Sequence, residues 1–198
     1  MSEGRRRRAN GEESRRRILD AAAEVAGERG YDGTSIAQVS ARCGLPASSI
    51  YWHFKDKDEL IAAVIERSFV EWMKAFEVEG DDIVGLVVRI GKALVETPDF
   101  LRLGLMLTLE RRPQEASARR VFLEVRTKTL ARIREMVRAF APGLGDRGVE
   151  LLAVYAMAAV DGFFVAVEIG GDSVDLGALF ELHGRVLVDA ARHLVQGV

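Results

Sequence analysis

The sequence has little cysteine and little proline. It contains a single cysteine, Cys43, so an internal disulfide cannot form and nothing points to an oxidising compartment. Only 4 of its 198 residues are proline. The longest apolar run, residues 151–167, is interrupted by Asp161 and is shorter than the ~20 residues that a membrane span needs. We therefore expect a cytoplasmic protein whose apolar helices are buried, with no membrane partner.

What is abundant favours helices. Hydrophobic residues make up 48% of the chain and charged residues 29%, which is enough to build a core. No stretch alternates as a strand does, and apolar residues recur at helical spacing, so the sequence predicts an all-α fold of about nine helices. The expected helices cover about residues 15–29, 35–42, 47–54, 56–80, 82–96, 98–111, 114–141, 146–169 and 175–196.

The charges are distributed unevenly. Residues 1–57 hold 11 basic and 8 acidic side chains, a net of +3, whereas the remainder holds 17 basic and 22 acidic side chains, a net of −5. A basic head on an acidic body is typical of a chain that touches a polyanion at one end. Residues 1–13 lack periodicity and predict a flexible basic arm, whose arginines at 5–8 would follow a DNA backbone or groove, or form a solvated tail.

Two short helices joined by a glycine turn follow the first helix. Ser35 and Gln38 have the spacing of a capping box, and Gly44 permits a tight turn. The next helix, ASSIYWHF, can bury Ile50 and Phe54, which leaves hydroxyl, imidazole and aromatic groups on its open face. Such groups can donate to phosphates and contact base edges. Residues 35–54 therefore predict a helix-turn-helix.

Residues 15–74 closely resemble the DNA-binding domain of TetR-type transcriptional regulators. The segment RRILDAAAEVAGERGYDGTS is similar to the family's first helix and its Gly-aromatic turn. The segment IAQVSARCGLPASSIYWHFKDKDELIAAV is similar to its second helix, recognition helix and fourth helix. The resemblance implies a three-helix DNA-binding domain over 14–74 and a helical effector-binding and dimerisation domain over 75–198.

The resemblance also implies DNA contacts for eight side chains: Thr34, Ser35, Ser48, Ser49, Tyr51, Trp52, His53 and Lys57. Thr34 and Ser35 would bind phosphate, and Ser48 and Ser49 would lie against base edges. Tyr51 and His53 would contact the DNA backbone and neighbouring bases. The lysine would bind phosphate beside a helix N-terminus, and the tryptophan stands at a position that the family fills variably. Pro46 departs from the family pattern, which usually has a capping Ser or Thr at this position. The sequence therefore defines the first residue of the recognition helix only to within about one residue.

The second domain predicts a partner and a ligand. The helices at about 146–169 and 175–196 are apolar nearly all round, which predicts a homodimer through a four-helix interface. Apolar side chains at helical spacing are either ordinary core or the lining of a cavity for an apolar or amphipathic effector; the candidates are Trp72, Phe76, Phe100, Met106, Phe122, Tyr155 and Phe163. Asp161 would join a buried network, bridge the dimer, meet a cationic ligand or lie partly exposed.

Enzyme chemistry finds little support in the sequence. Residues 143–148 match GxGxxG, but a long helix precedes them in place of the strand that a dinucleotide fold needs. The three histidines have no metal-ligand spacing, and no nucleophile motif is present. We therefore expect no enzyme activity, cofactor or metal, but a regulator that effector binding releases from a palindromic double-stranded DNA operator. An architectural DNA protein or a helical scaffold are the alternatives.

Overall fold

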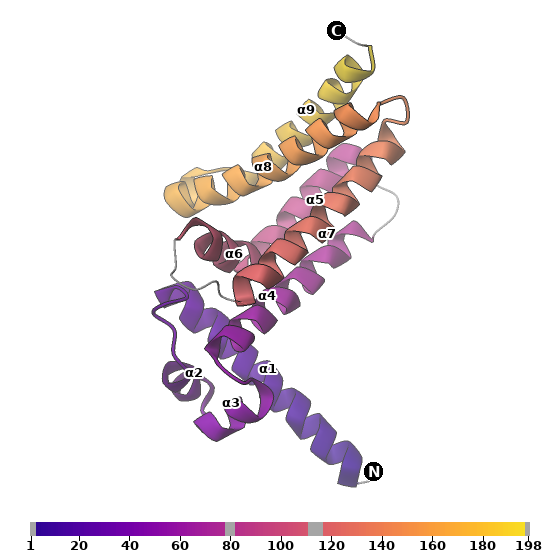
Figure 1. Ribbon diagram of the computed structural model, residues 1–198. Coiled ribbons are helices and arrows are strands. Elements are labelled where there is room, and N and C mark those ends of the chain that lie inside the picture. Colours follow the sequence, from indigo (N-terminus) through magenta and orange to yellow (C-terminus); the bar gives the residue numbers. More distant parts are fainter. Residues whose placement is uncertain (1–2, 78–81, 111–116, 197–198) are drawn as a thin grey trace. The chain divides into compact units, whose positions relative to one another are not determined.

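The computed structural model describes residues 3–77, 82–110 and 117–196 (Figure 1). Over these residues it contains nine α-helices, two 3-10 turns and no strand, which confirms the predicted all-α class. The elements in order are α1 (Glu3–Arg29), α2 (Ile36–Cys43), α3 (Ala47–His53), α4 (Lys57–Met73), η1 (Lys74–Phe76), α5 (Ile83–Glu96), α6 (Asp99–Leu109), α7 (Ser117–Phe140), α8 (Asp146–Gly170), η2 (Gly171–Ser173) and α9 (Leu176–Gln196).

The chain divides into two compact units. The head unit comprises Met1–Val70 and Pro98–Glu124, and the body unit comprises Glu71–Thr97 and Val125–Val198. By packing, the head unit therefore also takes α6 and the first turns of α7, which the sequence analysis assigned to the second domain. Two helices, α4 and α7, belong to both units because each crosses a boundary within its length.

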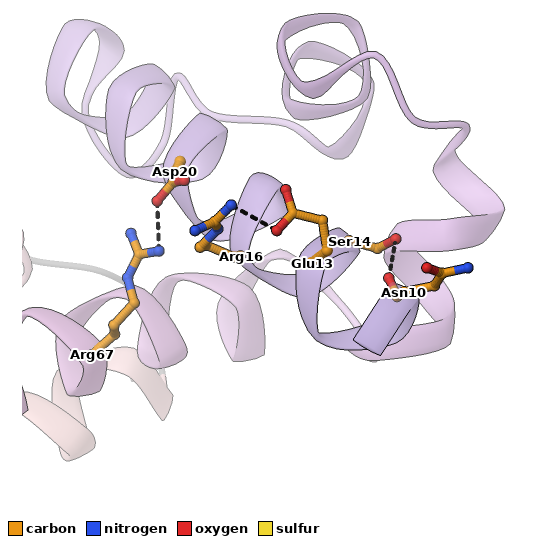
Figure 2. A network of polar contacts seen from close by, with 6 residues as sticks. All are labelled: Asn10, Glu13, Ser14, Arg16, Asp20 and Arg67. Atoms are coloured by element: carbon orange, nitrogen blue, oxygen red, sulfur yellow. Dashed lines mark hydrogen bonds and ion pairs between the residues drawn. The ribbon is translucent and has the colours of Figure 1, made fainter. Parts of the chain in front are cut away.

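Helix α1 begins at Glu3, so the predicted start near residue 15 is wrong. The expected flexible arm is helical over residues 3–13, where arginine, alanine and glutamate favour a helix although Gly4, Asn10 and Gly11 do not. Ser14 does not cap a helix; its hydroxyl donates to the Asn10 carbonyl one turn earlier, at 2.9 Å. Glu13 and Arg16 pair on the same turn at 2.6 Å (Figure 2). The side chains of Glu13, Ser14 and Arg16 thus find polar partners within α1 itself.

The core of the head unit follows the predicted stripe of α1. Its members at positions 18, 19, 22, 25 and 26 are all buried. Arg67 of α4 donates to Asp20 of α1 at 2.6 Å on the rim of this core (Figure 2). Helix α6 approaches α7 closely, because Gly104 leaves room for the Phe122 ring. A Cβ on Gly104 would lie 2.0 Å from that ring.

The body unit is built around α5, α7, α8 and α9. Its buried cluster includes Val87 of α5, Val137 of α7, Leu152 of α8 and Phe180 of α9. The indole N–H of Trp72 donates to the Ile90 carbonyl at 3.1 Å, which ties the end of α4 to α5. All the main helices of this unit therefore share one core.

One stretch, Asp146–Ser173, is long and apolar enough to cross a membrane by length and composition alone, a test that core helices also pass. The stretch contains Asp161, whose two carboxylate oxygens accept from Arg126 of α7 at 2.7 and 2.6 Å. Both side chains are about three quarters shielded, at 23% and 25% exposure. Of the alternatives considered for Asp161, the structure therefore describes a partly buried ion pair with Arg126 of the same chain.

Replacing Gly104 with alanine should destabilise the protein. The added methyl group meets the Phe122 ring in a packed core, where overpacking costs about 1–3 kcal/mol. Gly27→Ala is the matched control, because a Cβ there makes an ordinary 3.6 Å contact with Arg102 and gains helix propensity. Urea denaturation compares the two variants. Equal stability of both would contradict the close α6–α7 approach.

Candidate nucleic-acid interface

Helices α2 and α3 form the predicted helix-turn-helix. Ser35 is the N-cap of α2: its Oγ accepts from the Gln38 amide at 3.3 Å and donates to the Gln38 side chain at 2.9 Å. Gly44 ends the helix with φ of 65°, a left-handed conformation that favours glycine. The Ser35 N-cap and the glycine turn that the sequence predicted are confirmed, but the Gln38 side chain accepts from the Ser35 hydroxyl, whereas in a full capping box it accepts from the N-cap amide.

Side chains from α1 and α2 fix the turn between the two helices. Arg17 donates to the Cys43 carbonyl at 2.7 Å, and the Ser40 hydroxyl donates to the Leu45 carbonyl at 2.7 Å. Pro46 is the N-cap of α3 and supplies no side-chain cap, so the helix begins at Ala47. The turn is thus stabilised from outside α3, which compensates for the missing capping hydroxyl.

Helix α3 buries one face and exposes the other. Ile50 is 0% exposed and Phe54, just beyond the helix, is 3% exposed. Tyr51 and Trp52 are 56% and 77% exposed. Ser48 is also exposed, and Ser49 and His53 are half-buried. The structure therefore brings five of the predicted DNA-contact side chains together on one short helix.

A shallow groove separates this helix from the N-terminal half of α1. Its lining combines polar groups with one large aromatic surface: Asn10, Gly11, Ser14, Ser48, Ser49, Trp52 and His53. The Trp52 ring lies over Gly11, where an added Cβ would be 3.8 Å from it. The contribution of α1 to this surface was missed by the sequence analysis, which expected no helix there.

The remaining predicted DNA-contact residues differ in availability. Ser35 is exposed at the start of α2. Thr34 is 3% exposed, and its hydroxyl donates to the Gly30 carbonyl at 2.7 Å, so it stabilises the turn before α2. This geometry argues against the expected phosphate contact of the Thr34 hydroxyl. Lys57 is half-buried; its ammonium donates to the Tyr31 carbonyl at 3.0 Å and lies 4.4 Å from the centre of the Tyr31 ring.

Asp58, beside Lys57, was not identified from the sequence. Its carboxylate accepts from the Ser117 amide at 2.6 Å, from the Ala118 amide at 3.0 Å, from the Ser117 hydroxyl, and from the Tyr31 hydroxyl at 3.1 Å. Burial alone would raise the pKa of Asp58, but the donors from Ser117, Ala118 and Tyr31 outweigh it and lower the pKa. No sequence signal links Asp58 to residues that lie 59 and 60 positions away.

The His53 imidazole lies among cationic and aromatic neighbours. Burial and the Arg15 guanidinium both lower its pKa from the usual 6.5. The Trp52 ring meets the imidazole edge-on, with centroids 4.5 Å apart, and Arg15 lies over the Phe54 ring. A lowered pKa keeps His53 neutral at pH 7, so one ring nitrogen can donate and the other can accept.

The predicted effector-lining residues fall into two separate groups. In the head unit, Phe100 and Phe122 are buried, and the Met106 methyl group packs against Gly30. The other four, Trp72, Phe76, Tyr155 and Phe163, belong to the body unit.

Within the body unit the four residues again separate into two pairs. Trp72 and Phe76 stack edge-to-face, with ring centroids 4.9 Å apart. Tyr155 and Phe163 flank the buried His183 at 5.7 and 5.4 Å, and burial lowers the pKa of that histidine. The structure thus describes aromatic contacts within both pairs, although Tyr155 is 44% exposed, and the role of all seven residues in effector binding stays a prediction.

Comparison with known sequences finds a family match for the helix-turn-helix segment. Residues 18–64 match the model described as "Bacterial regulatory proteins, tetR family". The transcriptional regulator AcrR of Shigella flexneri is 34% identical over 64 residues, which are 32% of this chain and 30% of the relative. The match thus spans less than a third of the length of that relative. The transcriptional repressor AcnR of Corynebacterium diphtheriae is 26% identical over 170 residues, 85% of this chain and 88% of the relative.

Solved structures share the whole fold. A TetR/AcrR-type transcriptional regulator from Aquifex aeolicus superposes with a TM-score of 0.72 at 22% identity and covers 88% of this chain and 98% of its own. FadR of Bacillus subtilis in complex with stearoyl-CoA gives 0.72 at 19% identity, covering 88% and 97%. The helix-turn-helix segment, residues 18–64, therefore resembles the TetR family, and the fold over most of the chain is that of these solved structures.

Substituting Arg15 with glutamine should raise the pKa of His53. The increase should be partial, because burial, the larger cause of the lowered pKa, remains. Arg16→Gln is the control, since Arg16 is exposed, pairs with Glu13 and does not contribute to the His53 shift. An NMR titration of the imidazole protons measures both variants. The assigned role of Arg15 fails if the two titration curves superpose.

Proposed function

We propose that the chain is a dimeric, sequence-specific DNA-binding repressor that a small apolar or amphipathic effector releases from a palindromic operator. The observation that carries the proposal is the open face of α3. A seven-residue helix with exposed Ser48, Tyr51 and Trp52 is suited to the major groove, because its apolar residues are already buried. Helix-turn-helix proteins of this kind act in the cytoplasm, where their DNA is.

The charge distribution supports DNA as the partner. Residues 1–57 carry a net charge of +3, and the remainder of the chain carries a net charge of −5. Ser35 and Lys57 offer a hydroxyl and an ammonium to phosphate oxygens beside helix N-termini. In a two-fold dimer, two α3 helices would enter successive major grooves about 34–36 Å apart.

Exposed apolar side chains support a dimer through α8 and α9. On α8 they include Leu151, Val154 and Ile169, and Ile169 is 83% exposed; on α9 they include Leu182 and Val186. Isolated exposed apolar residues are ordinary, but repetition along two successive helices is typical of an interaction surface. A second copy of the same surface would bury both helices in a four-helix interface.

The effector class rests on the apolar character of the predicted lining residues. The structural neighbour FadR of Bacillus subtilis is in complex with stearoyl-CoA, an amphipathic molecule. The predicted lining residues of the present chain are aromatic or methionine, which suits a similarly apolar ligand. Release requires that the effector bind more tightly to the conformation that does not fit DNA.

Selection of bound sites from a random duplex library tests the proposal directly. A palindromic site should be enriched, and its affinity should fall by about 10³–10⁵ between 50 and 200 mM salt, because several phosphates are neutralised. Tyr51→Ala should lower operator affinity by about tenfold, the loss of one good base contact, while the dimer persists. Val70→Ala, at an exposed position of α4, is the control. Uniformly weak binding to every sequence would move the function to an architectural or scaffold role.

Leu182→Glu should convert the dimer to a monomer and thereby abolish operator binding. Leu182 is 58% exposed on α9, and a second copy of the surface would bring two carboxylates into an apolar interface. Val95→Glu on α5 adds the same charge at a 54% exposed position outside that surface. Analytical ultracentrifugation gives the mass of each variant. A dimeric Leu182→Glu protein would assign the interface elsewhere.

A further inference from the structure

We propose that Asp58 is a positioning residue that couples the first turn of α7 to the phosphate-binding residue Lys57. The inference rests on the proposed DNA-binding function. It adds a route by which α7 influences the position of the DNA-binding residues. It assigns a role to a carboxylate that itself contacts no DNA.

The carboxylate of Asp58 collects donors from two distant segments. From α7 it accepts the Ser117 and Ala118 amides at 2.6 and 3.0 Å and the Ser117 hydroxyl. From the turn after α1 it accepts the Tyr31 hydroxyl at 3.1 Å. The first amides of a helix have no partner within it, so a carboxylate at that position is held by both hydrogen bonds and the helix dipole.

Tyr31 passes the constraint on to Lys57. The same residue that donates to Asp58 through its hydroxyl accepts from the Lys57 ammonium through its carbonyl, at 3.0 Å. The ammonium also lies 4.4 Å from the centre of the Tyr31 ring, within cation–π range. The Tyr31 carbonyl further accepts from the Thr34 amide at 3.3 Å, at the entry to α2. A series of hydrogen bonds through Tyr31 thus links Asp58 to Lys57 and to the start of α2.

Helix α7 connects this point to the body unit. It spans Ser117–Phe140, and nine residues after its start Arg126 forms the paired hydrogen bonds with Asp161 of α8. One continuous helix therefore carries the Asp58 contact at its first turn and an α8 contact further along. A shift of α7 on effector binding would change the donors offered to Asp58 and, through Tyr31, the position of the Lys57 ammonium.

The test is a double-mutant cycle on operator affinity. Asp58→Asn keeps the shape of the side chain but loses the charge and one acceptor, and should weaken operator binding by about tenfold. Lys57→Gln should weaken binding by a similar factor. The double variant should bind no more weakly than the weaker single variant, because Lys57 contributes only while it is positioned. Additive losses would overturn the coupling.

Asp82→Ala is the matched control. Asp82 caps α5 in the body unit by accepting from the Gly85 amide at 2.8 Å, and alanine has no side-chain acceptor, so this replacement also removes a helix cap. This variant should lose stability as Asp58→Asn does, yet keep wild-type operator affinity. An equal loss of affinity in both variants would reduce Asp58 to a merely structural residue.

Amide hydrogen exchange tests the coupling between α7 and the Tyr31 turn in the absence of DNA. Ser117→Ala removes only the hydroxyl donor on α7, and should still accelerate exchange of the Thr34 amide, which is bonded to the Tyr31 carbonyl. Unchanged exchange at Thr34 would overturn the proposal. If the wild-type protein enriches no DNA site, the proposed function fails separately, and the exchange result still decides whether Asp58 couples α7 to this turn.

Discussion

The arrangement of the head unit depends on the burial of Ile50 and Phe54 against the first helix. A helix of seven residues is too short to be stable by itself in water, so α3 exists because its apolar face is covered. Burying these two side chains also fixes the rotation of α3 about its axis. The serine, tyrosine and tryptophan side chains are therefore exposed together as a consequence of packing. Arg17 and Ser40 hold the preceding turn by backbone contacts, which supplies what Pro46 lacks as a cap.

The features that local spacing encodes were predictable from the sequence. The Ser35 N-cap bond to Gln38, the left-handed Gly44 and the buried stripe of α1 each depend on residues within a few turns of one another. The helical state of residues 3–13 was not predictable from the sequence, because that segment has no apolar stripe and contains Gly4 and Gly11, which disfavour a helix.

Contacts between distant segments were beyond the reach of sequence patterns. The Asp58 contacts to α7 and the Arg126 partner of Asp161 join helices whose relative placement no single segment determines. The burial of Thr34 is of the same kind, since its family resemblance suggested a phosphate ligand whereas its hydroxyl completes the turn after α1. The sequence marked Asp161 as unusual but did not reveal its partner, and it gave no sign that Asp58 had partners on α7.

The continuous α1 has a consequence for the kinetics of encounter with a polyanion. A disordered basic segment loses conformational entropy when it is immobilised, about 1–2 kcal/mol for each backbone residue fixed. Residues 3–13 are helical already, so this cost has been met during folding. A preformed helix can take part in the first electrostatic approach, when steering sets the association rate. The length of α1 therefore bears on how fast a complex forms, as well as on how tightly it holds.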